Sequence, residues 1–349
     1  MQNHIKNGLI RLFFDSSTQE TPPPKTLHNI LLVSTTGLGD TLWATPAIRA
    51  LKKAHPQAKL FALTSPLGKE ILNDHPDIEK CFVFKKPYLL SFFRCRSLLK
   101  KRAWDAIVVF HASQRLIFPL CASLKTNHLI GTEKINKGLD FLFTKTFSQK
   151  PIHEAMRRLE LVSFLGASME ASSLEFPPFK KEKSSQDSTP LSILLHPGAQ
   201  DRYKCWPISC FIEVAKQLTQ KEKCKVFLSG TAQEQDLLKT IIKEVPSVQI
   251  IQTSSLKDLA KQMTKMDLLI TNDTGPMHLA TAIDLPVVAV FAPTDPKICG
   301  PFFAKKATVL SGRRTCTPCL KRKCRMPFCL LQTSPDQVLY ASKQLLGLL

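Results

Sequence analysis

Short apolar runs alternate with segments of helical periodicity along the first half of the chain. Thr45 and Pro46 predict the start of a helix that ends near Ala54, because threonine caps helices and proline fits their first turn. This alternation predicts a parallel sheet covered by helices on both faces. The apolar runs expected to form its strands are NILLV (29–33), KLFALTS (59–65), KCFVFK (80–85) and WDAIVVF (104–110).

The same alternation restarts near residue 191. Its expected strands are LSILLHP, KVFLSG, VQIIQ, DLLIT and VVAVFA, with helices over 208–219, 232–244 and 256–266 and a short one after Gly275. A stretch rich in serine, proline and charge separates the two halves and indicates a linker. We therefore predict an extension at 1–27, a first Rossmann-like domain at 28–168, a linker at 169–190, a second Rossmann-like domain at 191–333 and a terminal helix at 334–349.

The two ends of the chain also carry local signals. Ser334 followed by Pro335 is typical of a helix start. At the other end, one face of a short helix, either a membrane-touching helix or a packing arm, would be formed by Ile5, Leu9, Leu12 and Phe13.

Composition narrows the class of protein. With 349 residues, of which 44% are hydrophobic, the chain can bury two cores. No apolar run approaches the roughly 20 residues that cross a bilayer, and the N-terminal segment lacks a signal-peptide cleavage pattern. We expect a cytosolic protein. The formal charge of +20 favours a polyanionic partner, either nucleic acid, a membrane face or a phosphorylated substrate.

Part of that charge is concentrated in residues 85–102, which contain no acid. Aromatic and leucine residues lie between the basic ones, so we expect a surface helix that binds an anionic partner. The candidate contacts are Lys85, Lys86, Arg94 and Arg96.

Most of the eleven cysteines sit singly in apolar segments, where a thiol behaves as a small hydrophobe. Four others cluster near the C-terminus, within a basic stretch. Their spacing is irregular for zinc, and it leaves open a zinc knuckle, disulfides or free thiols in a packed loop. The four are Cys316, Cys319, Cys324 and Cys329.

The first candidate site is STTGLGDTLWATP, at 34–46, directly after the first strand. Glycines 37 and 39 permit a sharp turn at the carboxyl edge of the sheet, where such folds bind ligands. Leu42 stands where a dinucleotide fingerprint requires glycine, which argues against a nicotinamide cofactor. Asp40 is either a helix N-cap or a general base.

The second and third candidate sites follow strands of the second half. In LLHPGAQDRYKCWP, at 194–207, Lys204 lies just before a helix, where cations suit a diphosphate. In TNDTGPMHLA, at 271–280, the turn after Asp273 would point backbone N–H groups at an anion. Alternatively, Asp273 is a helix cap and His278 a packed histidine, while Lys204 is a solvated side chain.

These three motifs, in this order and spacing, resemble glycosyltransferase family 9, the lipopolysaccharide heptosyltransferases. The resemblance covers about residues 28–345 and includes GLGDTLWATPAIRALKKAHPQA and NDTGPMHLATAIDLPVVAVFAPTDP. It implies the α/β GT-B fold, with two Rossmann-like domains, a cleft between them and a last helix that returns to the first domain. The K-C-W form at 204–206 resembles third-heptose members, and the cysteine cluster resembles second-heptose members.

The resemblance also implies a reaction. Heptose would pass from ADP-heptose to the lipid A-core acceptor of lipopolysaccharide, with inversion and without a required metal or other cofactor, at the inner face of the inner membrane. Asp40 matches the family's catalytic base, and the second half matches its donor site. The matching donor residues are Lys204, Asp273, Thr274, Gly275, Pro276, His278 and, more loosely, Gly230 and Glu234.

Two alternatives accompany this reading. One is a family 9 relative that uses another sugar nucleotide or glycan acceptor, because the motifs indicate diphosphate binding more directly than sugar identity. The other is a basic nucleic-acid-binding protein, which leaves Asp40 and Asp273 unexplained. We expect the glycosyltransferase, acting as a monomer and without a nucleic-acid partner.

Overall fold

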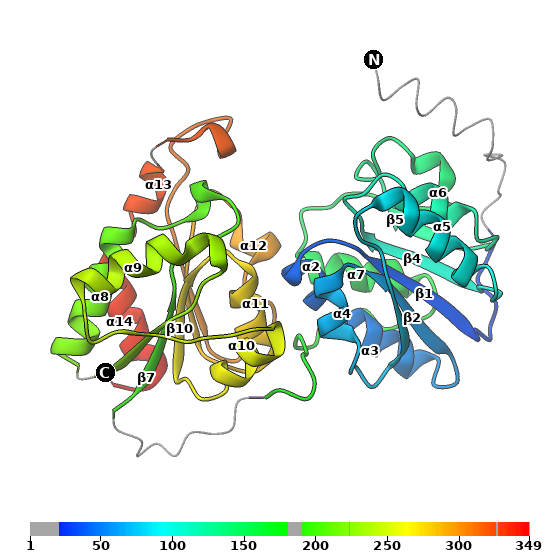
Figure 1. Ribbon diagram of the computed structural model, residues 1–349. Coiled ribbons are helices and arrows are strands. Elements are labelled where there is room, and N and C mark those ends of the chain that lie inside the picture. The colour runs from blue at the N-terminus through cyan, green and yellow to red at the C-terminus, as the bar shows by residue number, and fades with distance from the viewer. Residues whose placement is uncertain (1–20, 181–189, 223, 326, 349) are drawn as a thin grey trace. The chain divides into compact units, whose positions relative to one another are not determined.

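A computed structural model describes residues 21–180, 190–222, 224–325 and 327–348. The chain forms two compact units, which meet in the sequence between Ser172 and Ser173. Figure 1 shows that each unit is a parallel sheet flanked by helices. The predicted extension at 1–27, including the amphipathic pattern of Ile5 to Phe13, lies largely outside the described residues.

The sheet of the first unit has six parallel strands in the order β3-β2-β1-β4-β5-β6. Because β1 lies at the centre, the chain winds outward first to one side and then to the other. The strands are β1 (Asn29–Ser34), β2 (Lys59–Thr64), β3 (Ile78–Val83), β4 (Ala106–His111), β5 (Leu129–Thr132) and β6 (Lys145–Phe147). The helices are α2 (Leu38–Leu42), α3 (Thr45–Ala54), α4 (Pro66–Leu72), α5 (Tyr88–Leu99), α6 (Ile117–Ala122), the 3-10 turn η1 (Asp140–Leu142) and α7 (Glu154–Ser163).

The second unit repeats this winding, with the strand order β12-β11-β10-β7-β8-β9. Its strands are β7 (Ser192–His196), β8 (Lys225–Leu228), β9 (Gln249–Ile250), β10 (Leu268–Asn272), β11 (Val287–Phe291) and β12 (Ala307–Ser311). Its helices and 3-10 turns are η2 (Arg202–Lys204), α8 (Ile208–Gln220), η3 (Ala232–Glu234), α9 (Gln235–Glu244), α10 (Leu256–Met263), α11 (Gly275–Ala282), α12 (Pro296–Cys299), η4 (Lys321–Lys323), α13 (Phe328–Leu331) and α14 (Pro335–Leu346).

Both sheets therefore have the strand order of the doubly wound fold, in which two mononucleotide-binding halves meet at the first strand. The prediction of two Rossmann-like α/β sheets is confirmed. The central strands are buried on both faces, which explains their continuous apolar runs. Three short strands, β5, β6 and β12, were not predicted.

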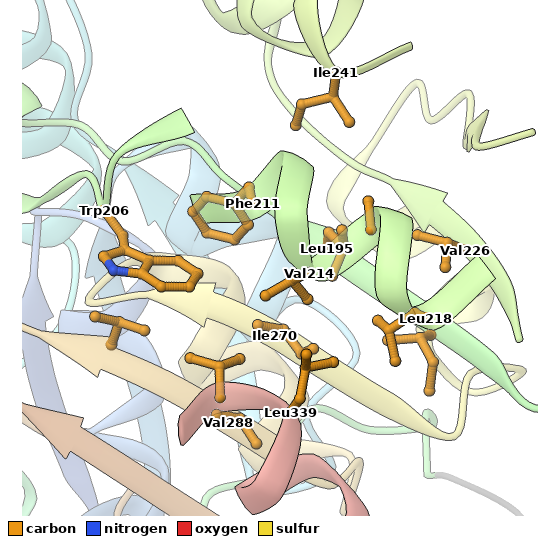
Figure 2. Packing of buried hydrophobic residues seen from close by; sticks show 14 of the residues in the cluster. Leu195, Trp206, Phe211, Val214, Leu218, Val226, Ile241, Ile270, Val288 and Leu339 are labelled. Atoms are coloured by element: carbon orange, nitrogen blue, oxygen red, sulfur yellow. The ribbon is translucent and has the colours of Figure 1, made fainter. Parts of the chain in front are cut away.

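Each sheet has its own core. In the second unit, Leu195, Ile270 and Val288 from neighbouring strands pack against Val214 and Phe211 of α8 (Figure 2). In the first unit, the central strands pack against side chains from α5 and α6. The two separate cores agree with two units that each bury enough apolar surface to fold.

The last helix corrects one expectation. The family resemblance placed it on the first domain, but α14 packs on α8, β10, β11 and β12 of the second unit. Its buried face, made by Val338, Leu339 and Ala341, belongs to the core of that unit, and Figure 2 shows Leu339 within this core. The helix begins at a capping box between Ser334 and Gln337, as the Ser-Pro pair predicted.

In the described part of the chain, every helix is too short or too polar to traverse a bilayer.

Candidate active site

The doubly wound order creates one switch point in each sheet, where neighbouring strands lead away in opposite directions. Ligands of open α/β sheets bind outside the carboxyl ends of the strands at this point. In the first unit the switch lies between β1 and β4, and in the second it lies between β7 and β10. Asp273 directly follows β10, and Asp40 lies in the short helix that follows β1.

Asp40 lies in α2, the short helix after β1. The helix predicted from Thr45 is α3, whose N-cap is Ala44, and the N-cap of α2 is Gly37. No side chain caps either helix, so the N-cap alternative for Asp40 is wrong. Gly37 has open space around its α-carbon and an extended backbone, and it turns the chain from strand into helix. Asp40 is therefore held at the first turn of α2 with its carboxylate available for side-chain contacts.

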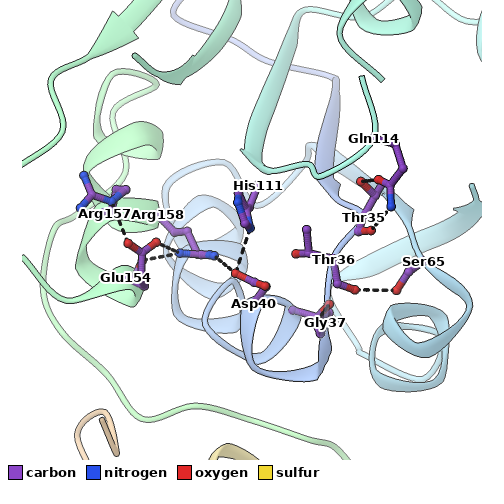
Figure 3. Close-up of polar contacts among 11 residues, drawn as sticks. Thr35, Thr36, Gly37, Asp40, Ser65, His111, Gln114, Glu154, Arg157 and Arg158 are labelled. Atoms are coloured by element: carbon purple, nitrogen blue, oxygen red, sulfur yellow. Dashed lines mark hydrogen bonds and ion pairs between the residues drawn. The ribbon is translucent and has the colours of Figure 1, made fainter. Parts of the chain in front are cut away.

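Two basic groups hold that carboxylate (Figure 3). Arg158 of α7 donates from Nη2 to Asp40 Oδ1 over 3.0 Å, and Nδ1 of His111, at the end of β4, lies 3.1 Å from the same oxygen. The Asp40 side chain is 22% exposed and that of His111 is 39% exposed, whereas Arg158 is fully buried. The carboxylate and the imidazole thus reach the surface together at the switch point.

Arg158 is balanced by a second carboxylate. Its Nη1 donates to Glu154 Oε2 over 2.9 Å and to the Glu154 carbonyl over 2.7 Å, and its guanidinium lies 5.3 Å from the centre of the Trp43 ring. A buried arginine is costly unless it is paired in this way. Glu154 and Asp40 together neutralise it.

This environment controls the charge of Asp40. Burial by itself would raise the pKa of the Asp40 carboxyl, but the hydrogen bond and charge of His111, with the charge of Arg158, hold the pKa well below its usual range. Asp40 is therefore ionised throughout the physiological pH range, as a proton acceptor must be.

In the second unit, Asp273 follows β10 and is almost completely buried. Its Oδ2 accepts from Lys204 Nζ over 2.7 Å and from Thr294 Oγ1 over 2.6 Å. Burial would lower the pKa of Lys204, yet the neighbouring Asp273 carboxylate raises it overall. Lys204 is therefore a fixed cation, and neither it nor Asp273 is the solvated side chain or helix cap of the alternative reading.

The loop that carries Lys204 is anchored to the same strand end. Asn272 accepts from the Trp206 backbone N–H over 2.9 Å and donates to the Pro197 carbonyl over 2.8 Å. The buried Trp206 ring donates from Nε1 to the Thr333 carbonyl over 3.0 Å. These bonds hold both ends of the 197–206 loop, so the position of Lys204 is determined by the fold.

The turn after Asp273 leads directly into α11. Thr274 is the N-cap, with extended backbone, and Gly275 and Pro276 open the helix. The Met277 N–H donates to the Thr274 carbonyl, and proline has no N–H. Of the backbone N–H groups in the turn after Asp273, those of Thr274 and Gly275 are therefore the ones that could bind an anion. His278 is buried within α11.

Gly230 and Glu234 lie just beyond β8, beside the switch strand β7. Glu234 closes a capping box with Thr231, accepting from its backbone N–H over 2.7 Å. A Cβ added at Gly198 would lie 1.8 Å from Glu234 Oε1. Only a glycine at this position lets the Glu234 carboxylate lie so close to the backbone of the 197–206 loop. Glu234 thus reaches the carboxyl edge that also carries Lys204.

The four candidate acceptor contacts lie on or just before α5. Lys85, Lys86 and Arg94 are exposed, whereas Arg96 is half-buried and donates from Nε to Ser123 Oγ over 3.2 Å. The surface helix predicted from residues 85–102 is confirmed as α5.

The clustered cysteines line a cavity of about 460 Å³, together with Tyr203 and Pro293. All four thiols are free, which corrects the disulfide alternative. Among the residues that the structure describes, no group of three or more histidine, cysteine or acidic side chains is arranged to hold a metal ion. The four are Cys316, Cys319, Cys324 and Cys329.

Sequence reasoning missed the partners of the predicted residues. His111, Glu154, Arg158 and Thr294 were not singled out, because they lie far along the chain from the predicted site residues that they surround. For His111 the sequence did offer a signal, because this residue ends an apolar run in the same way that Asp273 follows one.

Two doubly wound parallel sheets, each with polar groups at its switch point, form the α/β architecture of the GT-B fold. Solved structures share this fold. Glycosyltransferase family 9 from Veillonella parvula matches with a TM-score of 0.78 at 21% identity, over 94% of this chain and 99% of that one. Escherichia coli heptosyltransferase WaaC with ADP matches with a TM-score of 0.73 at 19% identity, over 91% and 99%.

Sequence comparison gives the family. The model of glycosyltransferase family 9 (heptosyltransferase) matches residues 95–329, more than half of the chain, and the protein belongs to that family. Lipooligosaccharide heptosyltransferase 2 of Campylobacter jejuni is 26% identical over 330 residues, which cover 89% of this chain and 96% of that protein. Lipopolysaccharide heptosyltransferase 3 of E. coli is 24% identical over 282 residues, covering 74% and 81%. The chain is therefore a glycosyltransferase enzyme.

Proposed function

We propose that the protein transfers L-glycero-D-manno-heptose from ADP-heptose to the inner core of lipopolysaccharide, with inversion of the anomeric carbon. The observation that supports binding of a nucleotide-sugar donor is the hydrogen-bonded group of Lys204, Asp273 and Thr294 at the switch point of the second sheet. Family membership and the names of the relatives support the sugar and the acceptor. WaaC has also been solved with ADP-2-deoxy-2-fluoro heptose.

In the donor site, Lys204 would neutralise the diphosphate as charge grows on the leaving ADP. The N–H groups of Thr274 and Gly275 would add hydrogen bonds to phosphate oxygens. Asp273, held by Lys204 and Thr294, would accept from hydroxyl groups of the sugar. Glu234 would approach the nucleoside, and His278 would support the turn from inside α11.

In the acceptor site, Asp40 would be the general base. An acceptor hydroxyl oxygen attacks the anomeric carbon, its proton passes to the Asp40 carboxylate, and the bond to ADP breaks with its electron pair leaving on the phosphate. One displacement of this kind inverts the anomeric carbon. Arg158 and His111 would orient the carboxylate, and none of these steps calls for a metal.

The acceptor also suggests a location. A core oligosaccharide built on lipid A is anionic and membrane-bound, so we propose that the protein works as a monomer at the inner face of the inner membrane. Lys85, Lys86, Arg94 and Arg96 would contact acceptor phosphates. We propose no nucleic-acid partner, because a polyanionic acceptor accounts for the basic charge and the nucleic-acid alternative leaves Asp40 and Asp273 unexplained.

A donor screen tests the proposal. The purified full chain is given ADP-heptose, ADP-glucose or UDP-glucose, each with and without truncated core acceptors, and nucleotide release is measured. We expect release of ADP from ADP-heptose that depends on the acceptor. Preference for another donor would support the family 9 relative with a different sugar, and no acceptor-dependent release from any donor would contradict the reaction.

A further inference from the structure

Helix α5 has one face in the core of the first unit. Ser91, Cys95 and Leu99 are buried and follow each other at a spacing of four residues, which places them on one side of the helix. Ser91 bonds to the backbone of Lys85, donating to its carbonyl over 2.6 Å. The helix is therefore held firmly by this side.

The opposite face of α5 is also apolar. Leu89, Leu90 and Phe93 are 59%, 67% and 60% exposed, and Leu98 is 40% exposed. Helical spacing puts Leu89, Leu90 and Phe93 on the side turned away from the buried row, whereas Leu98 lies at the edge of that row. Exposed apolar groups that gather on one element, with a polar rim, mark an interaction site.

The rim of this face is strongly basic. Lys85, Lys86, Arg94, Lys100 and Lys101 are exposed, and within the described part of the chain their side chains form no ion pair. Residues 85–102 contain no acidic residue. Apolar side chains flanked by free cations are the composition of helices that lie in the headgroup region of anionic bilayers.

We propose that the outward face of α5 docks the protein onto an anionic phospholipid bilayer. A soluble anionic saccharide would be recognised by the cations alone, and it offers nothing to cover Leu89, Leu90 and Phe93. A bilayer matches both features, because the apolar side chains enter the headgroup boundary while the lysines extend to lipid phosphates. The inference rests on the membrane location proposed above.

The test is cosedimentation of the full chain with vesicles, without donor or acceptor. Vesicles of phosphatidylcholine mixed with phosphatidylglycerol are compared with phosphatidylcholine alone, at low and high salt. The apolar variant is Leu90→Ser with Phe93→Ser. Its matched control is Leu331→Ser with Tyr340→Ser, two exposed apolar side chains of the second unit. The charge variant is Lys86→Gln, Arg94→Gln and Lys101→Gln, with Lys239→Gln, Lys261→Gln and Lys265→Gln as its control.

We expect the wild type to bind the anionic vesicles and salt to weaken this binding. Removal of three cations should weaken it about a hundredfold, since each contributes about 1 kcal/mol near an anionic surface, and the apolar variant should lose binding to a similar extent. Both control variants should bind like the wild type. With a water-soluble acceptor, the apolar variant should keep wild-type turnover.

Vesicle binding that is equal in the wild type and both α5 variants would overturn the proposal. So would an apolar variant that binds vesicles normally while the charge variant loses only binding to soluble core oligosaccharide, because α5 would then be a saccharide site. Since the vesicle assay uses no substrate, failure of the proposed reaction would leave its result intact and distinguishable.

Discussion

Replacement of Asp40 by asparagine separates its proposed role as a base from its role in folding. Asparagine keeps an oxygen that can accept from Arg158 Nη2, now 3.0 Å from Asp40 Oδ1, but it cannot take a proton at neutral pH. Arg158 also keeps its contacts with Glu154. We therefore expect Asp40→Asn to fold and to lose most of its turnover.

The two effects differ in size. Loss of a general base lowers turnover by about 10² to 10⁴, which is roughly 2.7 to 5.5 kcal/mol in the barrier. Loss of one charged hydrogen-bond partner costs about 1 to 2 kcal/mol of unfolding free energy here, because Asp40 is partly exposed and Arg158 retains Glu154. A domain of ordinary stability, about 5 to 15 kcal/mol, stays folded after such a loss.

The assay is the initial rate of acceptor-dependent ADP release at saturating donor, with the donor Kd from calorimetry and Tm from thermal unfolding. Glu154→Gln is the matched control, since it removes the other carboxylate on Arg158 and leaves Asp40 in place. We expect similar Tm values for the two variants and an unchanged donor Kd. Turnover of Asp40→Asn within tenfold of the wild type would refute the base, and an equal loss in Glu154→Gln would reduce Asp40 to a positioning residue.

The pH dependence follows from the lowered pKa of Asp40. A carboxyl group with a depressed pKa in the folded state contributes stability above its unfolded pKa of about 3.9, and this contribution disappears as the pH falls through the folded pKa. The difference in stability between wild type and Asp40→Asn should therefore be constant from about pH 5 to 8 and shrink in stronger acid. A difference that varies between pH 6 and 8 would assign the titration to another group.

Three further substitutions probe the second unit. Lys204→Ala should weaken donor binding by about 1.5 to 3 kcal/mol, the scale of a charged hydrogen bond, as measured by calorimetry. Lys216→Ala, at a partly exposed lysine of α8, is the control, and an unchanged Kd for Lys204→Ala would contradict the diphosphate role. Thr294→Val should weaken donor binding by about 0.5 to 1.5 kcal/mol with little change in Tm, whereas a large fall in Tm alone would make Thr294 purely structural. Trp206→Phe should lower the unfolding free energy by about 1 to 3 kcal/mol through the lost Thr333 bond and the smaller ring, and denaturant unfolding without such a loss would show that the loop is anchored elsewhere.

The chain's local patterns account for most of what the sequence predicted correctly. Continuous apolar runs identified the central strands, and Ser334-Pro335 located the last helix. The runs for β5, β6 and β12 were too short, or too mixed with polar residues, to stand out. The sequence also did not predict on which unit α14 packs, because the pattern of an amphipathic helix shows which face is buried but not which sheet covers that face.

The sequence by itself determined where the chain turns at the end of a buried strand, and hence that Asp40, Lys204 and Asp273 lie in the segments that follow strand ends. Only the tertiary structure decided which groups meet there. Arg158 reaches Asp40 from 118 residues away, and Lys204 reaches Asp273 from 69 residues away. Periodicity and turn chemistry act over a few neighbouring residues, whereas these pairs depend on which strands lie side by side, and that order is decided by the burial of whole sheet faces.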